Sequence, residues 1–301
     1  QYNNHDIKNI PFKGFYNAEK MGASLTANWR IGKIYAEAEM SQAKTPDILV
    51  HLEVDTLQVD PFYKNEYWKN PVVSFQFDGN MKGTDSDNLD LSAQIEGLDF
   101  RDSTLHFAPG LIALNAGKKD DGNHYISLSS SFLSANIDGQ YKFSTLADEL
   151  SNLMHEYIAN IFQTKKRIRR EGNNFTFNIY TNNTEELGRI FELPFDIIEP
   201  ARIDGTINTI DSKIDIKGNV PFARFGNIDI KNTTIDVANR DSMFNIQAGS
   251  NIMMGDGFYG AAFKVNGANS SMHAFLDVTS NNTEVPINGG LEKLAQINGG
   301  E

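Results

Sequence analysis

Most of the chain alternates apolar with polar or small residues at a period of two, as Leu133–Phe143 does. Strict alternation gives a strand one buried and one solvated face, which is typical of antiparallel sheets, whereas buried parallel strands show continuous apolar runs. The alternation therefore predicts a mainly β protein. The alternating segments are 48–54, 73–77, 89–95, 133–143, 175–179, 203–207, 214–216, 228–230, 235–237, 244–246, 263–265 and 272–278.

A short motif, apolar-x-Gly-x, recurs within these segments at Gly79, Gly139, Gly205 and Gly218, with a partial copy at Gly97. Each glycine has the parity of the apolar residues, so we expect it on the inward face. Glycine weakens a strand unless bending or a close approach requires it. The motif therefore favours an elongated sheet that curves over its apolar face, either as an open groove (a β-taco) or in a sandwich-like form.

One segment breaks the alternation. Between Leu146 and Phe162 the apolar residues are spaced by three and four, which predicts a long amphipathic helix packed on the sheet. Thr145, followed by Asp148 three residues later, fits a helix N-cap with an acidic first turn, and Gly172 ends the helix.

A second, short helix is predicted to start at Asn183 or Thr184 and to carry Leu187, Ile190 and Phe191. The sequence thus divides into an N-terminal β region (1–143), the amphipathic helix (144–171) and a C-terminal β region (172–301) that continues the same groove.

The chain offers little catalytic chemistry. It has no cysteine among its 301 residues, which excludes disulfides, thiolate metal sites and cysteine nucleophiles. Gly255–Gly260 matches G-x-G-x-x-G, but a strand-like segment follows instead of the helix that a dinucleotide site requires, so we interpret it as a hairpin turn. The net charge of −12 disfavours nucleic-acid binding. We expect no enzyme activity, metal or cofactor, although plentiful acidic residues leave a two-carboxylate hydrolase open.

The helix ends in a run of basic residues. Such a run either contacts lipid headgroups or is a solvated helix end whose cations complement the helix dipole. The headgroup-contact candidates are Lys165, Lys166, Arg167, Arg169 and Arg170.

Several segments in this order resemble the TamB/AsmA-like proteins of Gram-negative cell envelopes, in the long form found in Bacteroidetes. The similarity lies in pattern and covers about two thirds of the chain. The segments that carry it are Asp90–Leu98, Ile126–Gly139, the helix Leu146–Tyr157, Pro200–Ile207 and Ile214–Ile230.

The resemblance implies a non-enzymatic, periplasmic protein with a taco-shaped β body that serves lipid transport or outer-membrane assembly. Its expected partners are a phospholipid or other acyl-chain lipid and, through regions outside this chain, an outer-membrane barrel assembly protein. Family members are anchored in the inner membrane by an N-terminal helix. Neither that anchor nor the family's C-terminal domain is recognisable here, so we expect an internal segment of a longer protein.

By the same analogy, inward residues would line a lipid groove. An empty apolar groove in water is costly, at roughly 25 cal/mol per Å². We therefore expect the helix to cover part of the groove and lipid to cover the rest. The candidate lining residues are Ile95, Ile137, Tyr141, Phe175, Phe177, Ile203, Ile207, Ile214 and Ile216.

The alternative is a closed β-sandwich that binds glycans or proteins. Glycan sites present exposed aromatic side chains, and Tyr63, Tyr67 and Trp68 form a candidate patch.

Overall fold

The chain is mainly β, as its alternation predicts. The computed structural model describes residues 10–63, 67–83, 85–157, 172–240, 243–268 and 271–280. Within these residues, 67% of the structure is strand, in an open antiparallel sheet of 17 strands, and there are two α-helices. The prediction of a mainly β antiparallel fold with one long and one short helix is confirmed.

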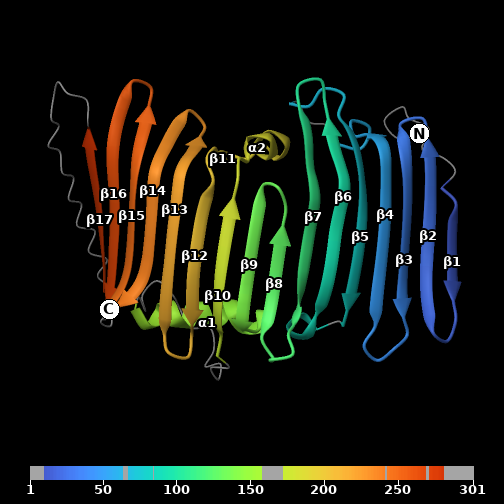
Figure 1. Ribbon diagram of the computed structural model, residues 1–301, viewed down its shortest axis with the longest axis horizontal. Helices are drawn as coiled ribbons and strands as arrows, with labels where there is room; N and C mark the ends of the chain where they lie inside the picture. Colours follow the sequence, from blue (N-terminus) through green and yellow to red (C-terminus); the bar gives the residue numbers. More distant parts are fainter. Residues whose placement is uncertain are drawn as a thin grey trace, which may run out of the picture. The chain divides into compact units, whose positions relative to one another are not determined.

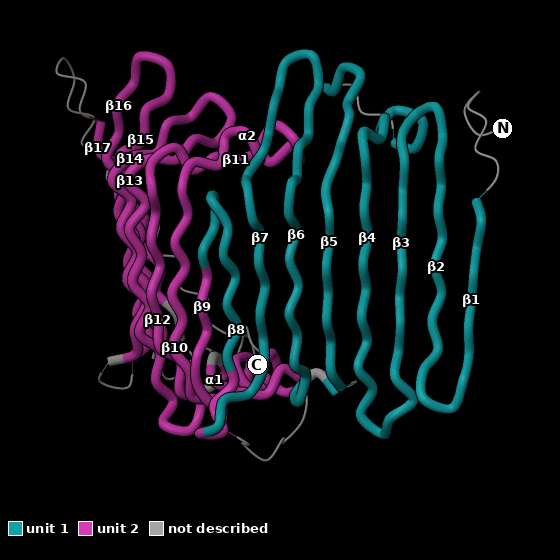
Figure 2. The backbone as a smooth tube through the Cα atoms, turned by 45° about the vertical axis from the view of Figure 1, so that its right-hand side comes forward, with its two compact units in different colours: residues 1–120, 125–134 teal, residues 121–124, 135–301 magenta. Residues whose placement is uncertain are grey.

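The chain divides into two compact units (Figure 2). Unit 1 holds residues 1–120 and 125–134, and unit 2 holds residues 121–124 and 135–301. The predicted helical segment, which separates the two β regions in the sequence, belongs to unit 2.

Unit 1 is built from strands that follow one another as antiparallel hairpins (Figure 1). A 3-10 turn, Ser86–Asn88, lies between β5 and β6. The strands are β1 (Phe12–Tyr16), β2 (Lys20–Trp29), β3 (Gly32–Ser41), β4 (Asp47–Gln58), β5 (Val72–Lys82), β6 (Asp90–Arg101), β7 (His106–Lys118) and, at the division between the units, β8 (His124–Ser129).

The alternation of unit 1 is reset at bulges. The register shifts between Val54 and Leu57 in β4 and between Ile95 and Leu98 in β6. A backbone with positive φ lies at the β4 shift, at Thr56, and another lies at the β6 shift, at Gly97. An extra residue at a bulge exchanges the odd and even positions between the two faces of the strand. In β4 and β6 this exchange keeps the apolar residues beyond the bulge on the same face as those before it.

The buried residues of unit 1 lie toward one end of its strands. The loop after β4 contributes to this packing: the Phe62 ring lies 6.0 Å from that of Trp29, and the Trp68 ring meets that of Phe100 edge-on at 5.1 Å. We call these four residues, Trp29, Phe62, Trp68 and Phe100, the aromatic cap. The buried apolar residues of unit 1 are Ala27, Ile31, Val54, Phe100, Leu105 and Phe107.

Unit 2 is a second antiparallel array, in which β10 pairs with β12 and the short β11 lies beside β13. From β12 to β17 each strand pairs with the next. The strands are β9 (Leu133–Gln140), β10 (Asn174–Thr181), β11 (Phe195–Ile197), β12 (Ala201–Asn208), β13 (Lys213–Phe225), β14 (Ile228–Arg240), β15 (Met243–Met254), β16 (Gly257–Ala268) and β17 (Ser271–Ser280).

Two glycines of the repeated motif, Gly139 and Gly205, make room for neighbouring groups. A Cβ added to Gly205 would lie 2.4 Å from the ring of Phe177, its partner across the β10–β12 pair. In β9, Gly139 has a φ of +144°, and an added Cβ would lie 2.3 Å from the carbonyl oxygen of Asn174. Side chains at these positions would displace a ring or a backbone.

The two helices belong to unit 2. Helix α1 spans Phe143–Tyr157, so its start precedes Thr145 and the predicted N-cap is wrong. The Thr145 amide donates to the Lys142 carbonyl, which places this residue in the first turn. The predicted continuation of the helix to residue 171 lies outside the described residues.

Helix α2 spans Glu185–Phe191 with Thr184 at its N-cap, as the sequence predicts. It ends where Glu192 takes a left-handed conformation, and the Leu193 amide donates to the Gly188 carbonyl.

Candidate functional site

One face of unit 1 is apolar across seven strands. Residues paired directly opposite each other point to the same face of a sheet, so pairing aligns side chains into rows across the strands. The first row is Phe12, Leu25, Ala36, Leu52, Phe77, Ile95 and Ile112; the second is Gly14, Ala23, Ala38, Val50, Gly79, Ala93 and Leu114; the third is Tyr16, Met21, Met40, Ile48, Met81, Leu91 and Ala116. We call these three rows the unit 1 apolar face.

This face is open to solvent among the residues that the structure describes. Every member of the three rows is half-buried or exposed, and Val50 keeps 36% of its surface. The middle row contains mostly small residues, and the rows on either side are mostly large. The aromatic cap covers the strands only beyond the first row, near Ala27 and Val54.

A shallow hollow of about 550 Å³ lies on the unit 1 apolar face between β1 and β4. Its floor includes the small residues Ala23 and Ala38, and Met21, Met40 and Ile48 surround it. A concave, mostly apolar surface of this kind fits a hydrocarbon ligand.

The predicted glycan patch is divided between packing and solvent. The Trp68 ring packs on Phe100 in the aromatic cap, and the Tyr63 ring lies 5.6 Å from that of Trp68. Tyr67 keeps 70% of its surface exposed. The three rings therefore do not form one flat exposed platform.

Unit 2 carries a corresponding apolar face in two rows, which we call the unit 2 apolar face. One row is Phe177, Gly205, Ile216, Val237, Ile246, Val265 and Ala274; the other is Ile179, Ile203, Gly218, Ile235, Ala248, Phe263 and Leu276. Phe263 is 41% exposed and Leu276 55% exposed, so this face is also partly open.

Helix α1 covers one end of the unit 2 apolar face (Figure 1). Its Leu153 is buried against Ile214 and Phe244. Ile216, Val237 and Ile246 pack against the same cluster.

The nine residues predicted to line a lipid groove differ in how deeply the structure buries them. Ile95 lies on the unit 1 apolar face, and the others belong to unit 2. The Tyr141 ring meets the Phe175 ring edge-on at 5.7 Å, and burial raises the pKa of the Tyr141 hydroxyl to about 12. Four candidates are buried, namely Tyr141, Phe175, Ile207 and Ile214; five are half-buried, namely Ile95, Ile137, Phe177, Ile203 and Ile216. The headgroup-contact candidates at 165–170 lie outside the described residues.

A buried polar cluster that the sequence analysis missed fastens α1 to the strands. Asn173 Nδ2 donates to Glu149 Oε2 at 2.6 Å, and Thr209 Oγ1 donates to the same oxygen at 2.7 Å. The Lys142 amide, just before α1, donates to Asn173 Oδ1 at 2.8 Å. Glu149, Asn173 and Thr209 are each exposed by 4% or less. The sequence pattern of an amphipathic helix does not indicate that one of its glutamates will be buried.

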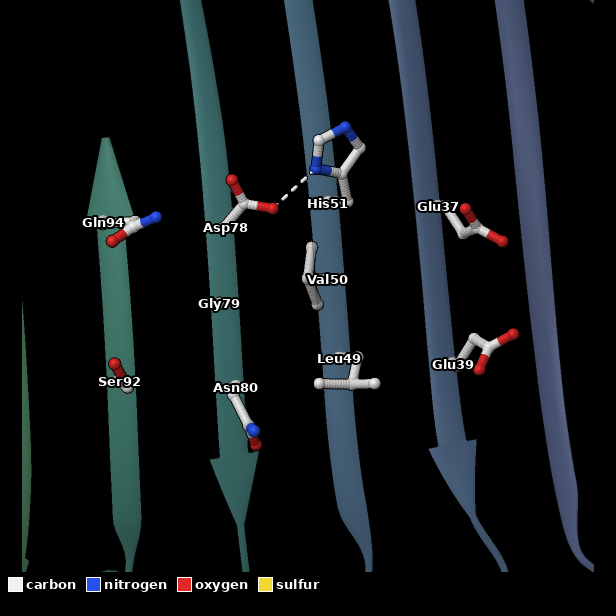
Figure 3. A pocket seen from close by; sticks show the side chains of 10 residues that line it. All are labelled: Glu37, Glu39, Leu49, Val50, His51, Asp78, Gly79, Asn80, Ser92 and Gln94. Atoms are coloured by element: carbon white, nitrogen blue, oxygen red, sulfur yellow. Dashed lines mark hydrogen bonds and ion pairs between the residues drawn. The ribbon is translucent and has the colours of Figure 1, made fainter. Parts of the chain in front are cut away.

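The opposite face of unit 1 is polar. A shallow hollow of about 500 Å³ lies there. Figure 3 shows the residues that line it, which are mostly carboxylates, amides and His51, with Ser92, Leu49, Val50 and Gly79 also at its wall. His51 Nδ1 lies 2.6 Å from Asp78 Oδ1, and His51 Nε2 lies 3.0 Å from Glu53 Oε1. The hydrogen bond to Asp78, helped by Glu53, raises the pKa of His51, and the same bond lowers the pKa of Asp78.

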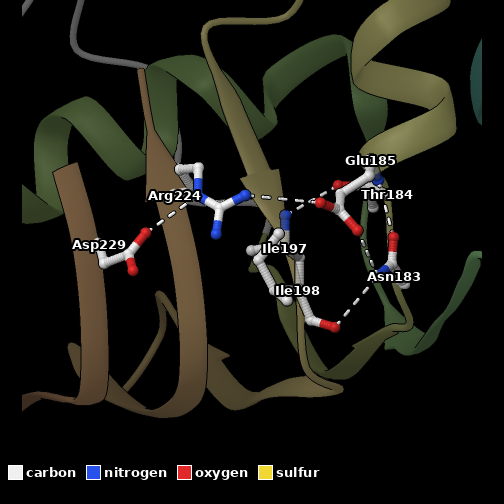
Figure 4. Close-up of polar contacts among 7 residues, drawn as sticks. All are labelled: Asn183, Thr184, Glu185, Ile197, Ile198, Arg224 and Asp229. Carbon is white, nitrogen blue, oxygen red and sulfur yellow. Dashed lines mark hydrogen bonds and ion pairs between the residues drawn. The ribbon is translucent and has the colours of Figure 1, made fainter. Parts of the chain in front are cut away.

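Polar contacts near α2 have a structural role (Figure 4). Thr184 Oγ1 accepts a hydrogen bond from the Ile197 amide at 2.8 Å, which joins α2 to β11. Arg224 links Asp229, at 2.9 Å, with Glu185, at 3.6 Å. These contacts hold α2 and β11 against β13 and β14.

The described residues contain no cluster of His, Cys, Asp or Glu able to hold a metal ion. In the same residues no helix is long and apolar enough to cross a membrane. No protein-family model matches the chain, and no similar protein was found among curated proteins or solved structures. A functional assignment therefore rests on the faces of the sheet and on the sequence resemblance.

Proposed function

We propose that this chain is a non-enzymatic, periplasmic segment of a TamB/AsmA-like envelope protein, and that its apolar sheet faces hold the acyl chains of phospholipids for lipid transport or outer-membrane assembly. The observation that carries the proposal is the unit 1 apolar face. It is apolar in three successive rows across seven strands, and none of its residues is buried.

Energetics favours a bound ligand on such a face. Contiguous exposed apolar patches mark binding surfaces, because apolar surface left in water forfeits roughly 25 cal/mol per Å². Each methylene of an acyl chain that leaves water contributes about 0.8 kcal/mol. Strands spaced by about 4.8 Å place the outermost of seven strands roughly 30 Å apart, comparable with the hydrocarbon thickness of a bilayer.

The difference between the apolar and the polar face of unit 1 also favours acyl chains as the ligand. The opposite face carries Glu37, Glu39, His51 and Asp78, which water solvates readily. Acyl chains therefore have one compatible face on each strand, and a lipid headgroup can remain in solvent at its margin.

The alternative, a glycan- or protein-binding module, has less support. Of the three aromatic residues proposed for it, Trp68 packs on Phe100. Tyr63, 57% exposed, touches Trp68 with its ring, and Tyr67 is 70% exposed. The open sheet also differs from the closed sandwich on which that alternative was based.

The test uses two neighbouring residues on opposite faces of β4. Val50 is on the unit 1 apolar face, and Leu49, which is 47% exposed, is on the polar face. The organic extract of purified protein is analysed by mass spectrometry, beside a mock purification. We expect Val50→Asp to lower co-purifying phospholipid by about tenfold, because a charge in contact with hydrocarbon is strongly unfavourable.

Leu49→Asp is the matched control and should retain the phospholipid of the parent protein. Thermal melts of both variants show that the fold persists. Equal phospholipid in the two folded variants, or none in the parent protein, would overturn the proposal.

A further inference from the structure

The buried side of α1 carries polar groups beside its apolar anchor Leu153. Thr145, Glu149 and Leu153 are spaced by four residues and therefore share one face of the helix. Leu153 packs on Ile214 and Phe244. The Thr145 hydroxyl is buried with no hydrogen-bond partner among the described residues, and the Glu149 carboxylate is 3% exposed. A helix packed permanently on an apolar sheet normally presents an apolar stripe.

We propose that α1 is a displaceable lid over the end of the unit 2 apolar face, fastened by the contacts of Glu149 with Asn173 and Thr209. When the lid opens, an acyl chain takes its place against the residues that Leu153 now covers. This inference rests on the proposed function and adds a means of regulating the same surface. Leu153 covers Ile214 and Phe244, and Ile216, Val237 and Ile246 pack, partly buried, against this cluster.

The closed state combines directional hydrogen bonds with the apolar contact of Leu153. Two hydrogen bonds reach one oxygen of Glu149, at 2.6 and 2.7 Å, and Leu153 is the one buried apolar residue among the described side chains of α1. Hydrogen bonds require short donor–acceptor distances and near-linear angles, so both bonds to Glu149 break when the helix moves. The unpartnered Thr145 hydroxyl further disfavours the closed state.

The open state needs a ligand. Lifting α1 leaves its apolar strip in water, which is unfavourable until hydrocarbon covers it. A ligand shifts such an equilibrium only by its preference for one state, and an acyl chain has contacts to gain only when the strip is uncovered. Lipid binding and lid opening are therefore coupled.

The absence of cysteine from the chain makes the lid accessible to a single-cysteine experiment. Val237→Cys places a thiol beneath the lid, and its reaction with a maleimide in lipid-free buffer reports opening. We expect Glu149→Ala to speed this reaction by about tenfold, since it removes both fastening hydrogen bonds and leaves the donors of Asn173 and Thr209 without this acceptor. Asp148→Ala, an exposed change on the same helix, should leave the rate within about twofold of the parent, as is usual for surface substitutions.

Two further variants separate lid opening from unfolding. Thr209→Val removes one donor to Glu149 and should also speed labelling of Val237→Cys. Ala201→Cys, 5% exposed in β12, reports unfolding of unit 2 and should label slowly in every background. Unchanged labelling of Val237→Cys in the Glu149→Ala protein, or equal acceleration at Ala201→Cys, would overturn the lid.

The phospholipid content of the same proteins distinguishes this inference from the proposed function. We expect Glu149→Ala to carry more phospholipid than Asp148→Ala. Faster labelling with no phospholipid in any variant would contradict the proposed function. Unchanged labelling with phospholipid present would contradict only the lid.

Discussion

At the residue scale, the polar face of unit 1 centres on His51, which bridges Asp78 on β5 and Glu53 on its own strand. Tyr35 and Glu37 on β3 also face this histidine: the Tyr35 ring lies 5.9 Å from it, and Glu37 is its partner across the β3–β4 pair. Protonated His51 is surrounded by negative charge, which is why its pKa is raised.

The pH dependence of this bridge follows from the two pKa shifts. A raised His51 pKa stabilises the folded state below the unfolded value of about 6.5, and this contribution is lost as pH rises through the folded pKa. A lowered Asp78 pKa stabilises above about 3.8 and is lost as pH falls below it. We expect the stability difference between the parent and His51→Gln to be largest near pH 5 and to shrink by pH 8.5. Urea melts at several pH values measure it, and a difference independent of pH would contradict this account.

The inward-facing glycines show which features of a residue the sequence predicts and which it does not. Parity alone predicts that Gly205 and Gly218 face inward, and register confirms it. The reason is visible only in three dimensions: Gly205 lies under the Phe177 ring, whose strand is paired with it from a distant part of the chain. Long-range pairing of this kind is not encoded in any local pattern.

At the element scale, the helix α1 combines an apolar anchor with a polar fastening. Of the predicted apolar residues, Leu153 is buried, and Leu146 and Leu150 are half-buried. The polar Glu149 is also buried, which the sequence pattern does not indicate. Hydrogen bonds from Asn173 and Thr209 hold Glu149, and these two residues lie outside α1 in the sequence.

The buried Thr145 hydroxyl of α1 predicts an unusual stabilising substitution. Thr145→Val removes a buried hydroxyl that has no hydrogen-bond partner and keeps the shape of the side chain. We expect it to raise the free energy of unfolding by about 1 kcal/mol. Denaturant melts measure the change, with Thr206→Val at an exposed position of β12 as control. Loss of stability in Thr145→Val would show that the hydroxyl has a partner in solution.

The strands illustrate which part of a β fold a period of two can predict. Alternation identifies most of the strands and their apolar sides. It does not reveal the bulges at Thr56 and Asn232, whose positive φ lies where β4 and β14 change register. A bulge adds one residue, so the positions that face the apolar side change from odd to even or from even to odd. The alternation is therefore interrupted in the sequence, although the apolar residues stay on one face of the folded strand.

At the scale of the whole molecule, the sheet is open rather than closed, and each of the two units carries an apolar face of its own. The sequence predicts the alternating faces and the presence of the two helices. It does not show that α1 is held by a buried carboxylate, because side-chain burial depends on elements that meet only after folding. The resemblance to TamB/AsmA-like proteins and the open apolar rows support the same proposal, that hydrocarbon completes the fold.

The most direct measurement of this proposal is photo-crosslinking of lipid inside a Gram-negative host. Phe263, 41% exposed on the unit 2 apolar face, is replaced with benzoylphenylalanine, and Phe222 serves as the control. The Phe222 ring lies 4.9 Å from Lys231 Nζ, near Arg224, on the charged side of the same unit. The account predicts phospholipid crosslinked at Phe263 and none at Phe222. Equal crosslinking at both positions, or none at Phe263, would contradict it.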